Sequence, residues 1–154
     1  MDFLHKLNSD TVAEAMSAPP LCVAPDMPLC AVFAHLKEHR SGGILVCRDG
    51  CLAGIFTERD ALKLMASGAS LDVPIETAMI ANPVAIKSSD TVAAAIRTMS
   101  VGGYRRLPVV DENNCPVGMV NVADLVHYLC EHFPQAVYNL PPEPQPVMQG
   151  REGA

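Results

Sequence analysis

Apolar and polar residues along the chain follow two periodicities that occur twice in the same order. Short apolar runs after a proline, at about residues 20–24 and 83–87, are predicted to be strands. Residues 28–39 and 90–100 place apolar side chains at helical spacing and are predicted to be amphipathic helices. Glycine pairs follow both of these helices and are expected to end them.

Two further strands follow each helix. ILVC and LAGIF in the first copy, and LPVV and PVGMV in the second, are separated by Asp49-Gly50 and by Glu112-Asn113-Asn114, which suit hairpin turns. A last helix is predicted at about 57–66 and again at 121–131. The expected unit is therefore βαββα, present twice. The expected fold class is α/β (α+β), because each repeat combines helices with both parallel and antiparallel strands.

The repetition is visible in individual residues. The matched pairs are Met16 with Met79 at an offset of 63, and Gly54 with Gly118 and Asp60 with Asp124 at an offset of 64. A unit of about 60 residues is marginally stable alone, so the two copies are expected to pack sheet to sheet around a pseudo-two-fold axis. Ligands of open sheets bind beyond the carboxyl ends of strands, which predicts one cleft at each strand-to-helix junction.

The junction of the first copy has the sequence GIFTERD, residues 54–60. Thr57 would place a hydroxyl among the free amides of a helix start, where the helix dipole favours a phosphate. Asp60 offers acceptor oxygens for the hydroxyls of a ribose. The same pair also resembles a capping box, worth about 1 kcal/mol, and the two interpretations are compatible.

Composition and charge narrow the possible functions. The chain has 154 residues and a net charge of −6, which argues against a broad nucleic-acid surface. No apolar run approaches the roughly 18 residues of a membrane span, and no secretory signal is recognised, so we expect a cytoplasmic protein without membrane contact.

Cysteine and histidine suggest no metal centre. The six cysteines are expected to be reduced core thiols. His35 and His39 lie one helical turn apart, but no third ligand is apparent from the sequence, so solvated histidines are the favoured interpretation.

Taken together, the ordered motifs over about residues 10–131 resemble a tandem pair of CBS domains, the Bateman module. The resemblance implies a non-catalytic sensor that binds AMP, ADP, ATP, NAD or S-adenosylmethionine and requires no cofactor. It also implies a homodimer, a flat disk of four domains. No fused enzyme or transporter is recognised in the sequence, so we expect an effector protein in trans. The expected divisions are an N-terminal helical segment (1–15), the two repeats (16–70 and 71–131) and a proline-rich tail (132–154). The tail is expected to be disordered or extended, with packing on the module or on a partner subunit as the alternative.

Residues at several positions are candidates for binding such a nucleotide. The first copy is the favoured site, although its junction residues are also expected as helix caps. In the second copy Asn121 replaces the threonine and Arg106 is the phosphate candidate by analogy with the family, whereas strand alternation sends Arg105 to the opposite face. The full set is Thr57, Arg59, Asp60, Arg106, Asn121 and Asp124, with Leu21, Cys22, Val23, Val84, Ala85 and Ile86 as apolar walls or main-chain contacts.

Three functional hypotheses follow. The favoured one is a regulatory nucleotide-binding module, and the alternative is a ligand-free scaffold for dimerisation and interaction. A small hydrolase or metalloenzyme is disfavoured because the sequence shows no nucleophile-base pair, no metal triad and no glycine-rich phosphate loop.

Overall fold

The computed structural model describes residues 3–134 and contains two sheets flanked by helices. The first repeat consists of β1 (Cys22–Val23), α2 (Leu29–Glu38), β2 (Gly43–Arg48), β3 (Cys51–Thr57) and α3 (Glu58–Ser67). The second consists of β5 (Ile86–Lys87), α4 (Val92–Gly102), β6 (Arg106–Val110), β7 (Pro116–Asn121) and α5 (Val122–His132). The predicted βαββα unit is therefore confirmed in both copies. The predicted first strands are reduced to two residues each.

The sheets have the orders β1-β2-β3-β4 and β5-β6-β7. In both, the first pair of strands is parallel and the following hairpin is antiparallel. The hairpin register places Gly43 opposite Thr57 and Arg106 opposite Asn121. The start of the middle strand thus lies beside each strand-to-helix junction.

Each repeat is completed by the segment that precedes the other repeat. β4 (Ile80–Ala81), which follows the short 3-10 helix η2 (Ile75–Thr77), pairs with β3 of the first sheet. Correspondingly, Ser17 forms a bridge with Met119 on β7 of the second sheet. The N-terminal elements α1 (Phe3–Ser9) and η1 (Val12–Glu14) therefore pack against the second repeat.

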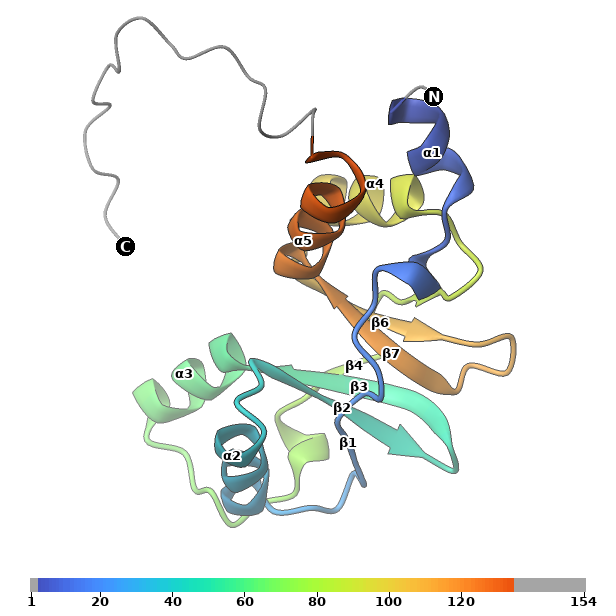
Figure 1. Ribbon diagram of the computed structural model, residues 1–154. Coiled ribbons are helices and arrows are strands. Elements are labelled where there is room, and N and C mark those ends of the chain that lie inside the picture. The colour runs from blue at the N-terminus through green and yellow to red at the C-terminus, as the bar shows by residue number, and fades with distance from the viewer. Residues whose placement is uncertain (1–2, 135–154) are drawn as a thin grey trace, which may run out of the picture.

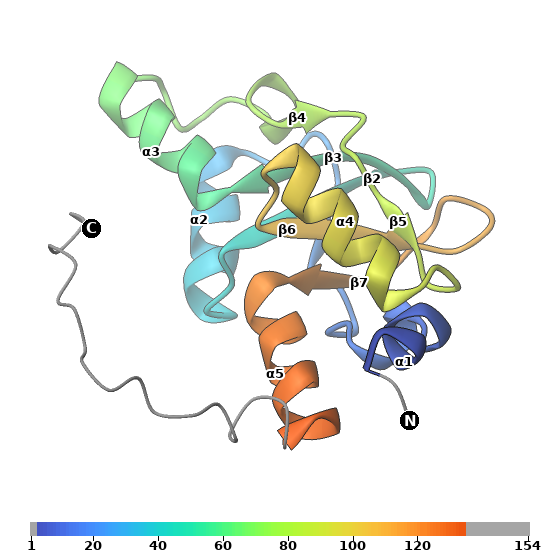
Figure 2. The same ribbon diagram turned by 90° about the horizontal axis from the view of Figure 1, so that it is seen from above.

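The two sheets face each other, and the helices lie on the outer sides (Figures 1 and 2). The interface core joins Leu45, Leu52 and Ile55 of the first repeat to Val110 of the second. At the hairpin tips, the Leu52 N–H donates to the Asn114 carbonyl at 2.9 Å. This arrangement confirms the predicted sheet-to-sheet packing. No helix within residues 3–134 is long and apolar enough to cross a membrane.

The cysteines are free, but the expectation of core thiols is wrong. Cys22, Cys30 and Cys51 are exposed and the other three are only partly buried, because they lie at strand ends, hairpins and outer helix faces. Cys47 comes nearest to the expectation: burial and a hydrogen bond with Cys22 raise its pKa to about 12. Such a thiol stays protonated at neutral pH and is a poor nucleophile.

Candidate functional site

Both predicted junctions begin their helices with an aspartate that bonds back to the N-cap residue. The Thr57 N–H and hydroxyl donate to Asp60 Oδ2 at 2.9 and 3.0 Å. The Asn121 N–H donates to Asp124 Oδ2 at 2.9 Å, and Asn121 Oδ1 accepts from the Asp124 N–H at 2.8 Å. These bonds satisfy amides that a helix start leaves unpaired.

Capping uses only one carboxylate oxygen of each aspartate. The other oxygen of Asp124, Oδ1, accepts a hydrogen bond of 3.1 Å from the Ser17 hydroxyl, and Ser17 is exposed. A ligand hydroxyl can replace the serine hydroxyl without disturbing the cap. The structural and ligand-binding interpretations of this aspartate are thus compatible in the geometry.

A cleft of about 490 Å³ lies at the junction of the second repeat. The second repeat contributes Arg106, Met119, Asn121 and Asp124, whereas the other walls come from the chain before β1 and from the turn between α2 and β2. These other residues are Ser17, Pro19, Pro20, Leu21, His39, Arg40, Ser41, Gly42 and Gly43. The cleft is therefore formed jointly by the two repeats.

Arg106 reaches from β6 across to the first repeat. A Cβ atom on Gly42 would lie 2.0 Å from Arg106 Nη2, and one on Gly43 would lie 3.2 Å from Arg106 Cδ. The guanidinium occupies this position because neither glycine has a side chain. With Arg40 it gives the cleft two cationic groups, while Asp124 provides an anionic one.

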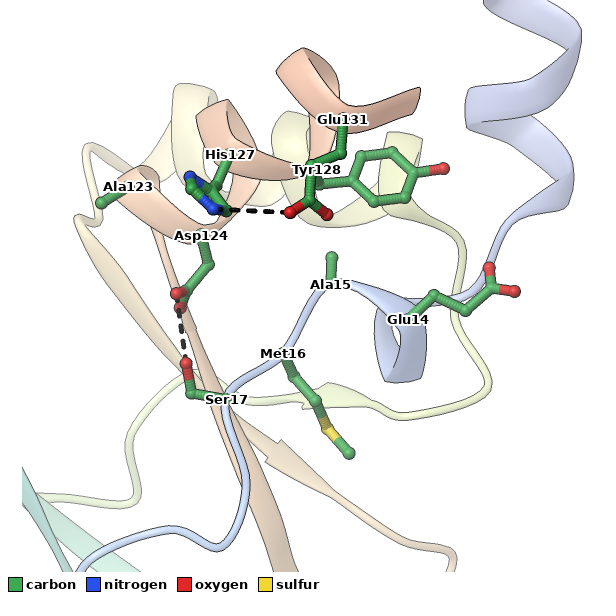
Figure 3. Close-up of a pocket in the computed structure, with 9 residues that line it drawn as sticks. All are labelled: Glu14, Ala15, Met16, Ser17, Ala123, Asp124, His127, Tyr128 and Glu131. Carbon is green, nitrogen blue, oxygen red and sulfur yellow. Dashed lines mark hydrogen bonds and ion pairs between the residues drawn. The ribbon is translucent and has the colours of Figure 1, made fainter. Parts of the chain in front are cut away.

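A second hollow, of about 340 Å³, shares Ser17 and Asp124 with this cleft (Figure 3). It is lined by Glu14, Ala15, Met16, Ser17, Ala123, Asp124, His127, Tyr128 and Glu131. Three carboxylates make it unfavourable for an anion. A phosphate is therefore better accommodated in the cleft that contains Arg106.

The remaining predicted site residues lie in varied surroundings. Thr57 and Asp60 do not line the cleft described above, and Arg59 is exposed on α3. Among the expected apolar contacts, Leu21 lines the cleft, Cys22 and Val84 are exposed, Ala85 packs on the interface core, and Val23 and Ile86 are buried core residues. Only the main chain of the two core residues could therefore touch a ligand. Arg105 is exposed, and it does not line the cleft.

Several cleft residues were missed by sequence reasoning, most clearly Ser17 and the 39–43 turn. Gly42-Gly43 was interpreted only as a helix stop. The two glycines also leave room for the Arg106 side chain from the other repeat. No local sequence pattern reveals this contact.

Comparison with known proteins agrees with this architecture. The CBS domain family model matches residues 12–67 and 72–131. The chain is a pair of CBS domains. The CBS domain-containing protein YhcV of Bacillus subtilis (strain 168) is 32% identical over 116 residues, which cover 75% of this chain and 82% of YhcV.

Solved CBS structures share the fold. CBSX2 in complex with AMP has a TM-score of 0.72 and 24% identity, covering 79% of this chain and 97% of CBSX2. The CBS domain pair of MJ0100, in complex with 5'-methylthioadenosine and S-adenosyl-L-methionine, has a TM-score of 0.71 and 24% identity, covering 79% of this chain and 96% of that chain.

Proposed function

We propose that this CBS pair is a regulatory module that binds an adenine nucleotide in the cleft between its two domains and signals to a partner protein in trans. The observation that carries the proposal is the reach of Arg106 over Gly42 and Gly43 into a cleft that also contains Asp124. One wall of the site therefore belongs to each domain.

The polar groups of the cleft fit the parts of a nucleotide. Arg106 is suited to a phosphate, since a guanidinium can donate two parallel hydrogen bonds to it. Asp124 Oδ1, now bonded to Ser17, is suited to a ribose hydroxyl. Pro20 and Leu21 provide an apolar wall for the base. The adenosine-containing ligands of CBSX2 and of the MJ0100 pair support the same ligand class.

Binding across the domain boundary offers a route to regulation. A ligand that contacts both domains stabilises the relative arrangement in which both contacts form, and it can shift the equilibrium only by this differential affinity. Partners that recognise one arrangement would then respond to nucleotide. No catalytic step is assigned to the module.

We further propose a homodimer through the helices that follow the junctions. α3 exposes Leu62 and Met65, and α5 exposes Val122 and Val126. Leu62 and Val126 are equivalent at the repeat offset of 64. Light scattering on the protein used in the titrations should report twice the chain mass of 16.4 kDa, and a monomer mass would contradict the dimer.

Calorimetric titration tests the nucleotide site. We expect AMP, ADP or ATP to bind wild type, and Arg106→Gln to weaken AMP by about tenfold, the loss of one charge-assisted contact, while leaving adenosine nearly unchanged. Asp124→Ala should weaken both ligands. Asp60→Ala is the matched control, because it removes the equivalent capping carboxylate from the other repeat.

Two other outcomes of these titrations would change the proposal. Loss of binding in Asp60→Ala with normal binding in Asp124→Ala would move the site to the first repeat, where the sequence first suggested it. Flat titrations with AMP, ADP, ATP, NAD and S-adenosylmethionine would favour the ligand-free scaffold.

A further inference from the structure

The C-terminal turn of α2 carries three potential metal ligands on one side. His35, Glu38 and His39 are spaced i, i+3 and i+4, and one ligand atom from each lies within 4.8 Å of the other two. The sequence showed the two histidines, and the structure supplies the glutamate as the third group. We propose that these side chains bind a divalent transition metal of the Zn²⁺ class, leaving one coordination position open.

The protonation of His39 suits this role. Its Nδ1 lies 2.9 Å from the His35 carbonyl oxygen, which can only accept, so Nδ1 carries the proton. The neutral ring then presents the lone pair of Nε2 for a metal. A carbonyl that orients a ligating imidazole through its other nitrogen is a common outer-shell arrangement in metal sites.

His35 provides an independent sign that a partner is needed. Its Nδ1 is buried and makes no hydrogen bond with any residue that the structure describes. A buried polar atom without a hydrogen-bond partner is unfavourable, and such atoms in native proteins call for a water molecule or an ion. The His35 and His39 rings are also nearly parallel, with centroids 5.9 Å apart and an interplanar angle of 23°.

The electrostatic surroundings favour a cation overall. The last carbonyls of α2 and the negative end of its dipole lie at this turn, and Glu38 adds a full negative charge. Lys37 and Arg40 oppose this, but Lys37 projects from the opposite side of the helix and Arg40 lines the cleft. His39 belongs to the cluster and also lines the cleft of the proposed nucleotide site, so the metal is tested in the absence of nucleotide.

Titration of the full-length protein with Zn²⁺ and Co²⁺ alone tests the site. Wild type should bind one ion per chain, and His35→Gln, Glu38→Gln and His39→Gln should each weaken binding by about tenfold or more. Saturating Zn²⁺ should raise the melting temperature of wild type more than that of these variants. His127→Gln is the matched control, because His127 and Glu131 also lie one turn apart, at 3.5 Å, on an exposed helix.

The cobalt spectrum separates this site from the free cysteines. Ligation by nitrogen and oxygen gives d–d bands without the intense sulfur-to-cobalt charge-transfer band of thiolates. Unchanged affinity in all three cluster variants, a thiolate spectrum, or equal loss in His127→Gln would overturn the proposal. Because Glu38 and His39 are exposed, their variants should keep the wild-type circular dichroism spectrum, so loss of binding would not reflect unfolding.

Discussion

The two strand-to-helix junctions share a backbone design but differ in what faces them. At the repeat offset of 63, the counterpart of Ser17, which bonds to Asp124, is the apolar Ile80. The counterpart of Arg106 is Gly43. The two repeats thus have helix caps of similar geometry, whereas Ser17 and Arg106 occur only at the second junction, where they line the proposed nucleotide cleft.

The segments that complete the two domains pack in the same way, but they bring different side chains to the junctions. Met79 packs on Gly54 of the first domain, and Met16 packs on Gly118 of the second. The Ser17 carbonyl lies close to Gly118, as the Ile80 carbonyl lies close to Gly54. This close approach places the Ser17 hydroxyl in the cleft, so packing and site are linked in the second domain.

Substituting these glycines should give the largest difference between the domains. A Cβ on Gly118 would lie 2.8 Å from the Ser17 carbonyl oxygen, whereas one on Gly54 would lie 3.1 Å from the Ile80 carbonyl oxygen. The methionine tips can move, but the backbone cannot, so we expect Gly118→Ala to cost about 2–3 kcal/mol and Gly54→Ala about 1 kcal/mol. Urea denaturation measures both, and a larger cost for Gly54→Ala would contradict this ranking.

Tyr128 should show a smaller difference. It is buried on α5 and its hydroxyl donates to the Asp10 carboxylate, which fastens the N-terminal segment to the second domain. The equivalent residue of the first domain, Leu64, has no hydroxyl. Tyr128→Phe is expected to lower the free energy of unfolding by about 1 kcal/mol at neutral pH.

The effect of Tyr128→Phe should depend on pH. Burial, followed by the hydrogen bond to Asp10, raises the pKa of Tyr128 above that of a free tyrosine. The folded state holds this proton more tightly, so the stabilisation is complete below about pH 10 and decreases as the pH rises further. The stability gap between wild type and Tyr128→Phe should shrink as the pH rises above about 10, and a widening gap would contradict the assignment.

The sequence predicted the helices and strands of each repeat well because local periodicity determines them. The helix predicted at 57–66 is observed at Glu58–Ser67, and the one predicted at 121–131 is observed at Val122–His132. The exchange of completing segments was not predicted, because Ser17 meets Met119 across about a hundred residues. Only the fold brings such distant positions together.

The sequence predicted the junction residues of the candidate site, but not the residues from other segments that surround them. Asp124 and Asn121 were predicted from the repeated motif and Arg106 by analogy with the family, and all three line the cleft. Gly42 and Gly43, which leave room for Arg106, were predicted only to end the preceding helix. Glu38, the third ligand of the proposed metal cluster, was not predicted, because only the structure shows that its carboxylate lies near both histidine rings.

Exchanging the two N-cap residues should give the smallest effect. Asn121 Oδ1 accepts from the Asp124 backbone N–H, whereas the Thr57 hydroxyl donates to the Asp60 carboxylate. Because asparagine caps slightly better than threonine, Asn121→Thr should lower stability by about 0.5 kcal/mol and Thr57→Asn should raise it by a similar amount. Denaturation midpoints of the two variants and of the double variant measure this. Near cancellation in the double variant would show that the two caps are independent, whereas a loss in both single variants would show that each junction requires its own residue for reasons beyond capping.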